Sequence, residues 1–374
     1  MPSAGLATLA ATILAISPGT VLHAQRVVRE TATLWQQAKP LTLAPQQRWC
    51  ASADAPGCDL RNMDMVTAMP DGGILANDVQ GPLYRFAADG KFVGPMSRKG
   101  QGPGEYGFLV SPHVLDGRII WFDNTQMRLA SIGLDGVPGP VVRLMPPQTM
   151  ANIFAVGGEL VILDVPTAAR LGDTVVASYR TVPAAGAPRV LARVRTPSLF
   201  TPGSDMRRMA PAFSPRVVSD VGSAGDVAHS NGDRYVVEMF PASGAGWRLE
   251  IDAPRRQVTR ADRDSAMARA TRAFRVTSPA ALPADVRSAL LSPPGAHPPI
   301  SAIRVLRDGT VWIRLTSTVE ERDARWDVFR RDGTRMGRVT LPAAARVQDG
   351  TKDWVLVVQP GDDDVPQAVR YTIR

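Results

Sequence analysis

The stretch Met69-Pro-Asp-Gly-Gly-Ile-Leu-Ala-Asn-Asp78, continued by Leu83-Tyr-Arg-Phe-Ala-Ala-Asp-Gly90, decides the fold because a similar stretch follows it. The second copy is Leu115-Asp-Gly-Arg-Ile-Ile-Trp-Phe-Asp123, continued by Arg128-Leu-Ala-Ser-Ile-Gly-Leu-Asp-Gly136. Each copy contains a turn, an apolar strand that ends in an acidic residue, a second alternating strand and an Asp-Gly turn. The opening turns lie 45 residues apart, a spacing typical of four-stranded propeller blades.

Four fainter copies of this pattern follow. They contain Gly157-Gly-Glu-Leu-Val-Ile-Leu-Asp164, the segment from Val217 to Ile251, Asp308-Gly-Thr-Val-Trp-Ile-Arg-Leu315, and Asp353-Trp-Val-Leu-Val-Val358. Six copies predict an all-β fold, a six-bladed β-propeller of four-stranded antiparallel blades, with five or seven blades left open. The last copy is short of strands. The segment Pro40-Leu-Thr-Leu-Ala44 is expected to supply the missing one and close the ring, which removes an exposed sheet edge.

One helix is expected among the strands. Thr259-Arg-Ala-Asp262 has the pattern of a capping box, in which the Thr hydroxyl and the Asp carboxylate satisfy free N–H groups at the start of a helix. Ala-rich sequence continues from there to Phe274. The segment predicts one short surface helix inserted between two blades.

The N-terminal segment predicts export. Residues 1–24 carry no charged side chain, and the apolar run from Leu6 to Ile16 has the length of a signal-peptide core. This run is too short to span a bilayer, and a buried core helix is its alternative. No later run is long enough to cross a membrane, so a soluble protein, periplasmic or secreted, is expected. Three parts are predicted: a signal peptide over 1–24, an N-terminal segment over 25–58 that closes the last blade, and the propeller over 59–374.

The chain has two cysteines, Cys50 and Cys58, which are close in sequence. In an oxidising compartment this spacing favours a local disulfide, with two free thiols as the alternative. A metal site would need further ligands nearby, and the surrounding sequence has none.

The chain is basic, with a net charge of +8 from 43 Lys and Arg against 35 Asp and Glu. Such an excess is found in proteins that bind nucleic acids or anionic surfaces. Here the arginines are spread through the chain and alternate with acidic residues, so no basic stripe forms. The pattern argues against a nucleic-acid partner.

A further motif combines a Gly-rich turn, a proline and an Asp-Arg pair. Its residues are Gly100-Gln-Gly-Pro-Gly-Glu-Tyr106, Ser111-Pro112, Asp123 with Arg128, and Leu134-Asp-Gly136. The motif resembles the NHL-like six-bladed propellers found among exported bacterial proteins, closely over about residues 60 to 140 and more weakly over the rest. Gln126 departs from the repeat, where Asn is common. The family is functionally diverse, so the resemblance implies a fold far more than an activity.

Several motifs have both a chemical and a structural interpretation. The glycines of the Gly100–Tyr106 loop suit a phosphate cradle, but strands on both sides favour a structural turn. Asp123 and Arg128 are either a channel acid with a substrate-binding base, or residues that form a salt bridge of the repeat or hydrogen-bond the turn between strands, and the structural role is favoured. Asp362-Asp-Asp364 suits calcium but is more typical of a solvated turn. No Gly-x-Ser-x-Gly nucleophile elbow occurs.

Three histidines lie beyond the predicted signal peptide: His113, His229 and His297. Because each blade presents its innermost strand to the axis, His113 and His297, which precede predicted strands, are expected at the channel mouth. The expected ligand-binding residues are His113, Asp123, Arg128, His297 and Arg304. The resemblance implies that histidines at this position bind a metal in some NHL-type enzymes. The spacing here has no metal motif, so no cofactor is predicted, and a channel-bound divalent metal is the alternative.

These observations predict an exported, monomeric, non-catalytic propeller. It would bind a small-molecule ligand or a partner protein of the cell envelope through its top face and channel mouth. The alternative is a metal-dependent hydrolase or lyase, of the lactonase or NHL-lyase kind, with its site at the central channel. A purely structural module of the envelope is a third possibility.

Overall fold

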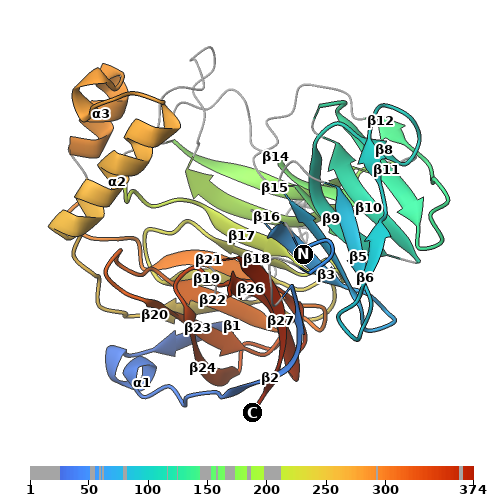
Figure 1. The fold of residues 1–374 in the computed structure, drawn as a ribbon. Helices are drawn as coiled ribbons and strands as arrows, with labels where there is room; N and C mark the ends of the chain where they lie inside the picture. The colour runs from blue at the N-terminus through green and yellow to red at the C-terminus, as the bar shows by residue number, and fades with distance from the viewer. Residues whose placement is uncertain are drawn as a thin grey trace, which may run out of the picture.

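The strands of the protein form six small sheets arranged as the blades of a propeller (Figure 1). The computed structural model describes residues 26–50, 55–58, 60, 63–78, 82–115, 117–123, 125–143, 153–156, 159–164, 173–182, 187–197, 212–291, 294–361 and 365–374. The predicted all-β, six-bladed β-propeller is confirmed, with five blades of four strands and one of five among the described residues. The predicted signal peptide lies outside them.

Within the blades, strands that follow one another in the chain pair side by side in antiparallel order. The first blade contains β3 (Met63–Ala68), β4 (Ile74–Asp78), β5 (Leu83–Phe86) and β6 (Phe92–Pro95). The second contains β9 (Leu109–Leu115), β10 (Arg118–Asp123), β11 (Arg128–Gly133) and β12 (Val142–Arg143). The third contains β13 (Ile153–Val156), β14 (Glu159–Asp164), β15 (Thr174–Val182) and β16 (Val190–Pro197). Between the first two blades, β7 (Arg98–Lys99) and β8 (Glu105–Tyr106) form a short parallel pair.

The second half of the ring has the same plan. The fourth blade contains β17 (Val218–Val221), β18 (Val227–Ser230), β19 (Val236–Phe240) and β20 (Trp247–Ile251). The fifth contains β21 (Ile300–Val305), β22 (Val311–Leu315), β23 (Asp323–Phe329) and β24 (Arg335–Pro342). The sixth contains β25 (Arg346–Gly350), β26 (Trp354–Pro360) and β27 (Pro366–Ile373). The first strand of each blade is innermost, and these strands contact one another in the order β25, β3, β9, β13, β17 and β21.

Blades are held together by apolar clusters, one between each pair of neighbours. A sheet whose two faces are both apolar must cover both, and a radial arrangement lets each blade cover the next. Fully buried tryptophans occupy four of these clusters. They are Trp121 between blades one and two, Trp247 between four and five, Trp312 and Trp326 between five and six, and Trp49 between six and one.

The chain before the first blade forms an N-terminal arm that lies along blades four, five and six. It consists of β1 (Arg26–Glu30), α1 (Ala32–Gln36) and β2 (Leu43–Trp49). β2 pairs antiparallel with β27 and completes the sixth blade, while β1 adds to the fourth blade as a fifth strand, parallel to β20. The closing strand thus begins at Leu43 and not at Pro40, which instead forms an isolated bridge with Arg338 of the fifth blade.

Between β1 and β2, the arm is fastened to the fifth blade through a buried carboxylate. Asp327 accepts a hydrogen bond of 2.8 Å from the indole Nε1 of Trp35 and one of 2.7 Å from the hydroxyl of Tyr235. Its other oxygen accepts from Arg335 at 3.2 Å and from Arg338 at 2.7 Å. The side chain of Asp327 is 0% exposed, so all of its lone pairs depend on these donors.

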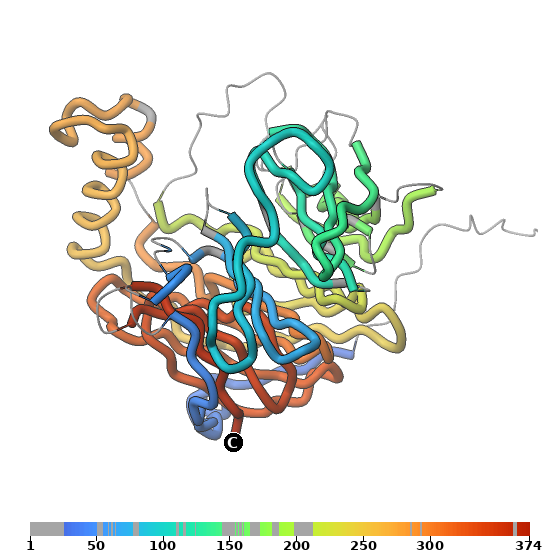
Figure 2. Tube along the Cα trace, turned by 45° about the vertical axis from the view of Figure 1, so that its right-hand side comes forward, coloured from blue at the N-terminus to red at the C-terminus, as the bar shows by residue number. Residues whose placement is uncertain are grey.

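The helical insertion between blades four and five is larger than the single helix predicted. α2 (Arg260–Ala273) has the expected capping box at Thr259 and Asp262. A 3-10 turn, η1 (Pro279–Ala281), and a second helix, α3 (Ala284–Leu291), then pack on α2 through a small apolar cluster. α3 has only eight residues and lies between proline-rich segments, so its sequence is too short to show a clear helical period. Figures 1 and 2 show the two helices projecting from one side of the sheets.

The predicted disulfide between Cys50 and Cys58 is confirmed. Both cysteines are buried in the cluster between blades six and one, beside Trp49 and Leu60. The disulfide therefore fixes the end of β2 to the entry of the first blade. Among the described residues, no helix combines the length and hydrophobicity needed to cross a bilayer.

Candidate functional site

Five of the six innermost strands line a cavity of about 240 Å³ at the centre of the ring, called the channel cavity below. Its polar lining residues are Thr67 of β3, His113 of β9, Asp220 of β17, Ser223, Arg304 of β21, Arg307, and Gln348 and Asp349 of β25. Because these side chains come from five different blades, the ring brings together polar groups that are far apart in sequence. Such convergence of polar groups in a concave site is typical of ligand-binding pockets.

His113 is half-buried in this cavity, opposite Ile120 in the pairing of β9 with β10. Removal from water lowers the pKa of its imidazole from 6.5 to about 4, with Asp349 opposing this shift and the cations Arg304 and Arg307 adding to it. The ring is therefore neutral at neutral pH. A neutral imidazole offers one N–H donor and one acceptor to a ligand.

Arg304 brings a positive charge to the cavity that is only loosely paired. Its Nε donates to the carbonyl of Val347 at 3.1 Å, while Nη1 lies 3.7 Å from Oδ1 of Asp220, beyond hydrogen-bond distance. The Arg304 side chain is 38% exposed. Burial raises the pKa of Asp220, and Arg304 opposes this shift. The guanidinium thus retains N–H donors for a ligand acceptor.

Arg307 and Asp349, in contrast, are engaged with each other. Nε of Arg307 donates to Oδ1 of Asp349 at 2.7 Å, and Nη2 donates to Oδ2 at 2.5 Å. Oδ2 also accepts from the backbone N–H of Ala68 at 2.9 Å, and Nη2 also donates to the Ala68 carbonyl. This bidentate pair joins blade five to blade six, its bonds to Ala68 add blade one, and together they hold the rim of the cavity rigid.

The lining residues do not fit a metal centre. In the part of the chain that the structure describes, no group of three His, Cys, Asp or Glu side chains lies close enough together to hold an ion. The carboxylates of the channel cavity already accept hydrogen bonds from Arg307 and from the backbone N–H groups of Ala68 and Val305. His113 is the one imidazole that lines it among the described residues.

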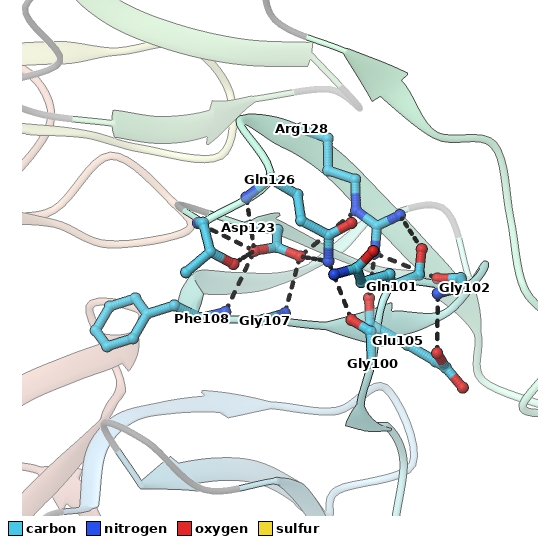
Figure 3. Close-up of polar contacts among 10 residues, drawn as sticks. Gly100, Gln101, Gly102, Glu105, Gly107, Phe108, Asp123, Gln126 and Arg128 are labelled. Carbon is cyan, nitrogen blue, oxygen red and sulfur yellow. Dashed lines mark hydrogen bonds and ion pairs between the residues drawn. The ribbon is translucent and has the colours of Figure 1, made fainter.

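The structure places Asp123 and Arg128 outside the channel cavity, at the start of the hairpin between β10 and β11 (Figure 3). Asp123 is 0% exposed and accepts hydrogen bonds from the backbone N–H groups of Gly107 and Phe108 at 2.9 and 3.2 Å. Arg128 lies 3.5 Å from it and donates to carbonyls of the Gly-rich loop, at 3.0 Å for Gln101. These bonds hold the loop against the blade.

Two other side chains, Gln126 of the turn and Glu105 of the Gly-rich loop, complete the network. Gln126 donates through Nε2 to Asp123 at 2.9 Å and to the Gly100 carbonyl at 3.0 Å, so the residue that departs from the repeat still bridges the two segments. Glu105 accepts from the N–H of Gly102 and from Arg98. We call the contacts of Asp123, Gln126 and Arg128 with residues 100–108 the loop knot.

The three histidines are not brought together. His297 lies on the helical insertion, 2.9 Å from Asp262 of α2, and not in the channel cavity. His229 is buried between blades three and four, with Nδ1 3.0 Å from the Tyr179 hydroxyl, and burial lowers its pKa to about 4. Of the predicted site residues, the structure therefore gathers His113 and Arg304 in one cavity and disperses the rest.

Sequence reasoning missed Asp220, Arg307 and Asp349. The repeated pattern begins at the Asp-Gly turn, after the innermost strand, so it does not include the strand that faces the axis. Arg307 directly precedes such a turn, and reading backwards from each turn would have found the lining residues.

Comparison with known proteins supports the fold. No family model matches the chain, and the search of curated proteins gives no match. A predicted exported protein from Bacteroides fragilis is similar in structure with a TM-score of 0.50 at 13% identity, over 93% of this chain and 98% of that one. A member of the DUF4221 family from Bacteroides vulgatus has a TM-score of 0.54 at 8% identity, over 89% and 98%. These likenesses show the propeller fold; membership of the NHL-like family stays a prediction.

Proposed function

We propose that this protein is an exported, non-catalytic propeller that binds a small anionic ligand, such as a carboxylate, in the channel cavity. The observation that carries this proposal is the position of Arg304, a cation in a concave site whose nearest carboxylate oxygen is 3.7 Å away. A guanidinium with free N–H donors recognises a carboxylate through charge-assisted hydrogen bonds.

Two further observations support a ligand of this class. His113 is neutral, so its N–H can donate to the ligand without adding a charge that would have to be desolvated. The Arg307–Asp349 pair fixes the rim, and a site that is already rigid loses little conformational entropy on binding. Export is supported by the disulfide, which suits an oxidising compartment, and by the exported structural neighbour.

The test is a titration of acetate, succinate and citrate, each followed by isothermal calorimetry, against the wild-type protein and Arg304→Gln. We expect at least one of the carboxylates to bind the wild type, and the variant to bind it about tenfold or more weakly, because a charge-assisted hydrogen bond is lost. The matched control is Arg260→Gln, which removes the same charge from a side chain that is 94% exposed on α2.

Two results would overturn the proposal. Equal binding by wild type and Arg304→Gln would show that the ligand does not bind at the channel cavity. Conversion of the bound carboxylate to a product, seen by NMR after prolonged incubation, would show that the protein is a catalyst. Elemental analysis of protein purified without chelator tests the alternative of a metal-dependent hydrolase or lyase, which requires about one equivalent of bound metal.

A further inference from the structure

A second hollow lies between the helical insertion and blades four and five, away from the channel cavity. It has two parts, of about 330 and 250 Å³, which share the lining residues Ala212, Arg216, Ala266 and Arg269. Because these four residues line both parts, the two parts are continuous and form one groove. We call it the helix-side groove.

The two ends of the groove differ in chemistry. One end is apolar and lies between α2 and α3, against Ala270, Phe274, Val286 and Leu290. The other end is lined by Ser214, Ser301, Thr316 and His297. A ligand that fills the whole groove must therefore have an apolar part and a polar part.

Positive charge lies where the two ends meet. Arg216 and Arg269 line both parts of the groove and are exposed, and neither forms an ion pair among the described residues. Arg269 donates only to the neutral hydroxyl of Ser265, at 2.8 Å. The segment from residue 254 to 299, which includes Arg269, has eight arginines against three aspartates, so this part of the chain carries an excess of positive charge.

A buried imidazole reaches the polar end. The side chain of His297 is 3% exposed, its Nε2 lies 2.9 Å from Oδ2 of Asp262, and its ring packs edge-on against Phe213. The pKa of Asp262 is lowered to about 2: burial opposes this shift, while the N–H of Val319 and the His297 ring produce it. Asp262 is thus ionised and fixes Nε2 as the protonated nitrogen, and the described residues give Nδ1 no partner.

We propose that the helix-side groove binds an aliphatic carboxylate. Arg216 and Arg269 bind the anionic head, the hydrocarbon chain lies between α2 and α3, and Nδ1 of His297 meets a polar substituent of the head. Burial of the chain supplies affinity through the hydrophobic effect, and the guanidinium groups give the ligand its direction in the groove.

Three probes separate the contributions of charge and chain. Decanoate carries both, acetate only the charge, and 1-decanol only the chain. Calorimetric titration of the full-length Arg304→Gln protein, in which the channel cavity lacks its cation, is expected to show clear binding of decanoate, with acetate and 1-decanol binding about tenfold or more weakly. Equal affinity for 1-decanol and decanoate would overturn the role of the arginines.

Variants then locate the site. Arg216→Gln combined with Arg269→Gln should weaken decanoate binding about tenfold or more. The control is Arg260→Gln combined with Arg272→Gln, which removes two exposed charges from α2 outside the groove. Phe274→Ser should weaken the binding of decanoate at the apolar end of the groove. It should leave the melting temperature unchanged, because Phe274 is exposed. Decanoate binding that survives all of these changes would overturn the proposal.

Failure of this proposal is distinguishable from failure of the proposed function. Arg304→Gln should leave decanoate binding unchanged, and the Arg216 and Arg269 double variant should leave carboxylate binding in the channel cavity unchanged. A free fatty acid and an anionic phospholipid share the same general chemistry, an anionic head joined to an apolar chain. Cosedimentation with phosphatidylglycerol vesicles that is lost in the double variant would identify a lipid as the source, and decanoate binding without cosedimentation a free carboxylate.

Discussion

Asp123 in blade two and Asp327 in blade five are both fully buried carboxylates, yet they do different work. Asp123 takes its hydrogen bonds from its own repeat, with the farthest donor, Gly107, 16 positions away. Asp327 takes one from Trp35, 292 positions away. The first carboxylate therefore shapes a turn within one blade, whereas the second joins the N-terminal arm to the ring.

A buried carboxylate thus stabilises one loop in blade two and the whole ring in blade five. The donors of the loop knot are already near Asp123 once the hairpin forms, so little chain entropy is lost in gathering them. Those of Asp327 come from the arm, from blade four through Tyr235 and from blade five. Removing Asp327 should therefore weaken the whole ring, and removing Asp123 mainly one loop.

The largest expected effect is that of Asp327→Ala. The substitution leaves two partly buried guanidinium groups, those of Arg335 and Arg338, without their shared carboxylate, and should lower the free energy of unfolding by about 3–5 kcal/mol. Urea denaturation followed by tryptophan fluorescence measures this. A loss no greater than that of Asp123→Ala would break the distinction between the two sites.

Asp123→Ala should cost about 2 kcal/mol, because buried N–H groups of the loop lose their acceptor. The effect should be concentrated in residues 100–108. Hydrogen exchange read by mass spectrometry is expected to show faster exchange in that loop and unchanged rates in blades four to six. Uniformly faster exchange across the ring would contradict a local role.

Trp35→Phe should lower the free energy of unfolding by about 1 kcal/mol more than the lost packing alone would, because the indole N–H that donates to Asp327 is absent. Trp121→Phe is a matched control, since the Nε1 of that equally buried indole has no hydrogen-bond partner among the described residues. Thermal unfolding of both variants gives the difference. Equal destabilisation would mean that the arm is held by packing alone.

The smallest effect is the pH dependence of the loop knot. Burial raises the pKa of Asp123, but hydrogen bonds from Gly107, Thr125 and neighbouring N–H groups outweigh it and hold the pKa below the ordinary 3.8. The stabilisation is therefore complete above the pKa of the unfolded chain and is lost as pH falls through the folded pKa. Unfolding measured from about pH 5 downward should show a shallower acid loss in Asp123→Asn than in the wild type.

The sequence predicts what is local or repeated and misses what is distant and unique. The capping box of Thr259 and Asp262 and the hairpin of blade two could be read because their partners are a few positions apart. The contact of Trp35 with Asp327 produces no periodic pattern in the sequence, and the short helix α3 produces none either. Because each repeat presents its first strand to the axis, His113 and Arg304, which lie on such strands, line the channel cavity.

His297 shows the limit of that reasoning. It precedes an innermost strand, as His113 accompanies one, but the helical insertion before it moves it out of the blade register and onto Asp262. Alignment of repeats carries no information about an insertion that occurs once. The candidate site could thus be located in outline, while the pairing of its charges required the structure.

The sixth blade pairs β2 with β27, two strands separated by more than three hundred residues of chain. During synthesis the residues of β2 leave the ribosome long before those of β27, so β2 has no partner in its sheet until β27 has been made. Truncated chains that lack the final hairpin therefore keep an open ring with an unpaired edge. Synthesis of β27 is therefore the step that permits closure, and until then β2 is an unpaired strand edge that other chains can pair with.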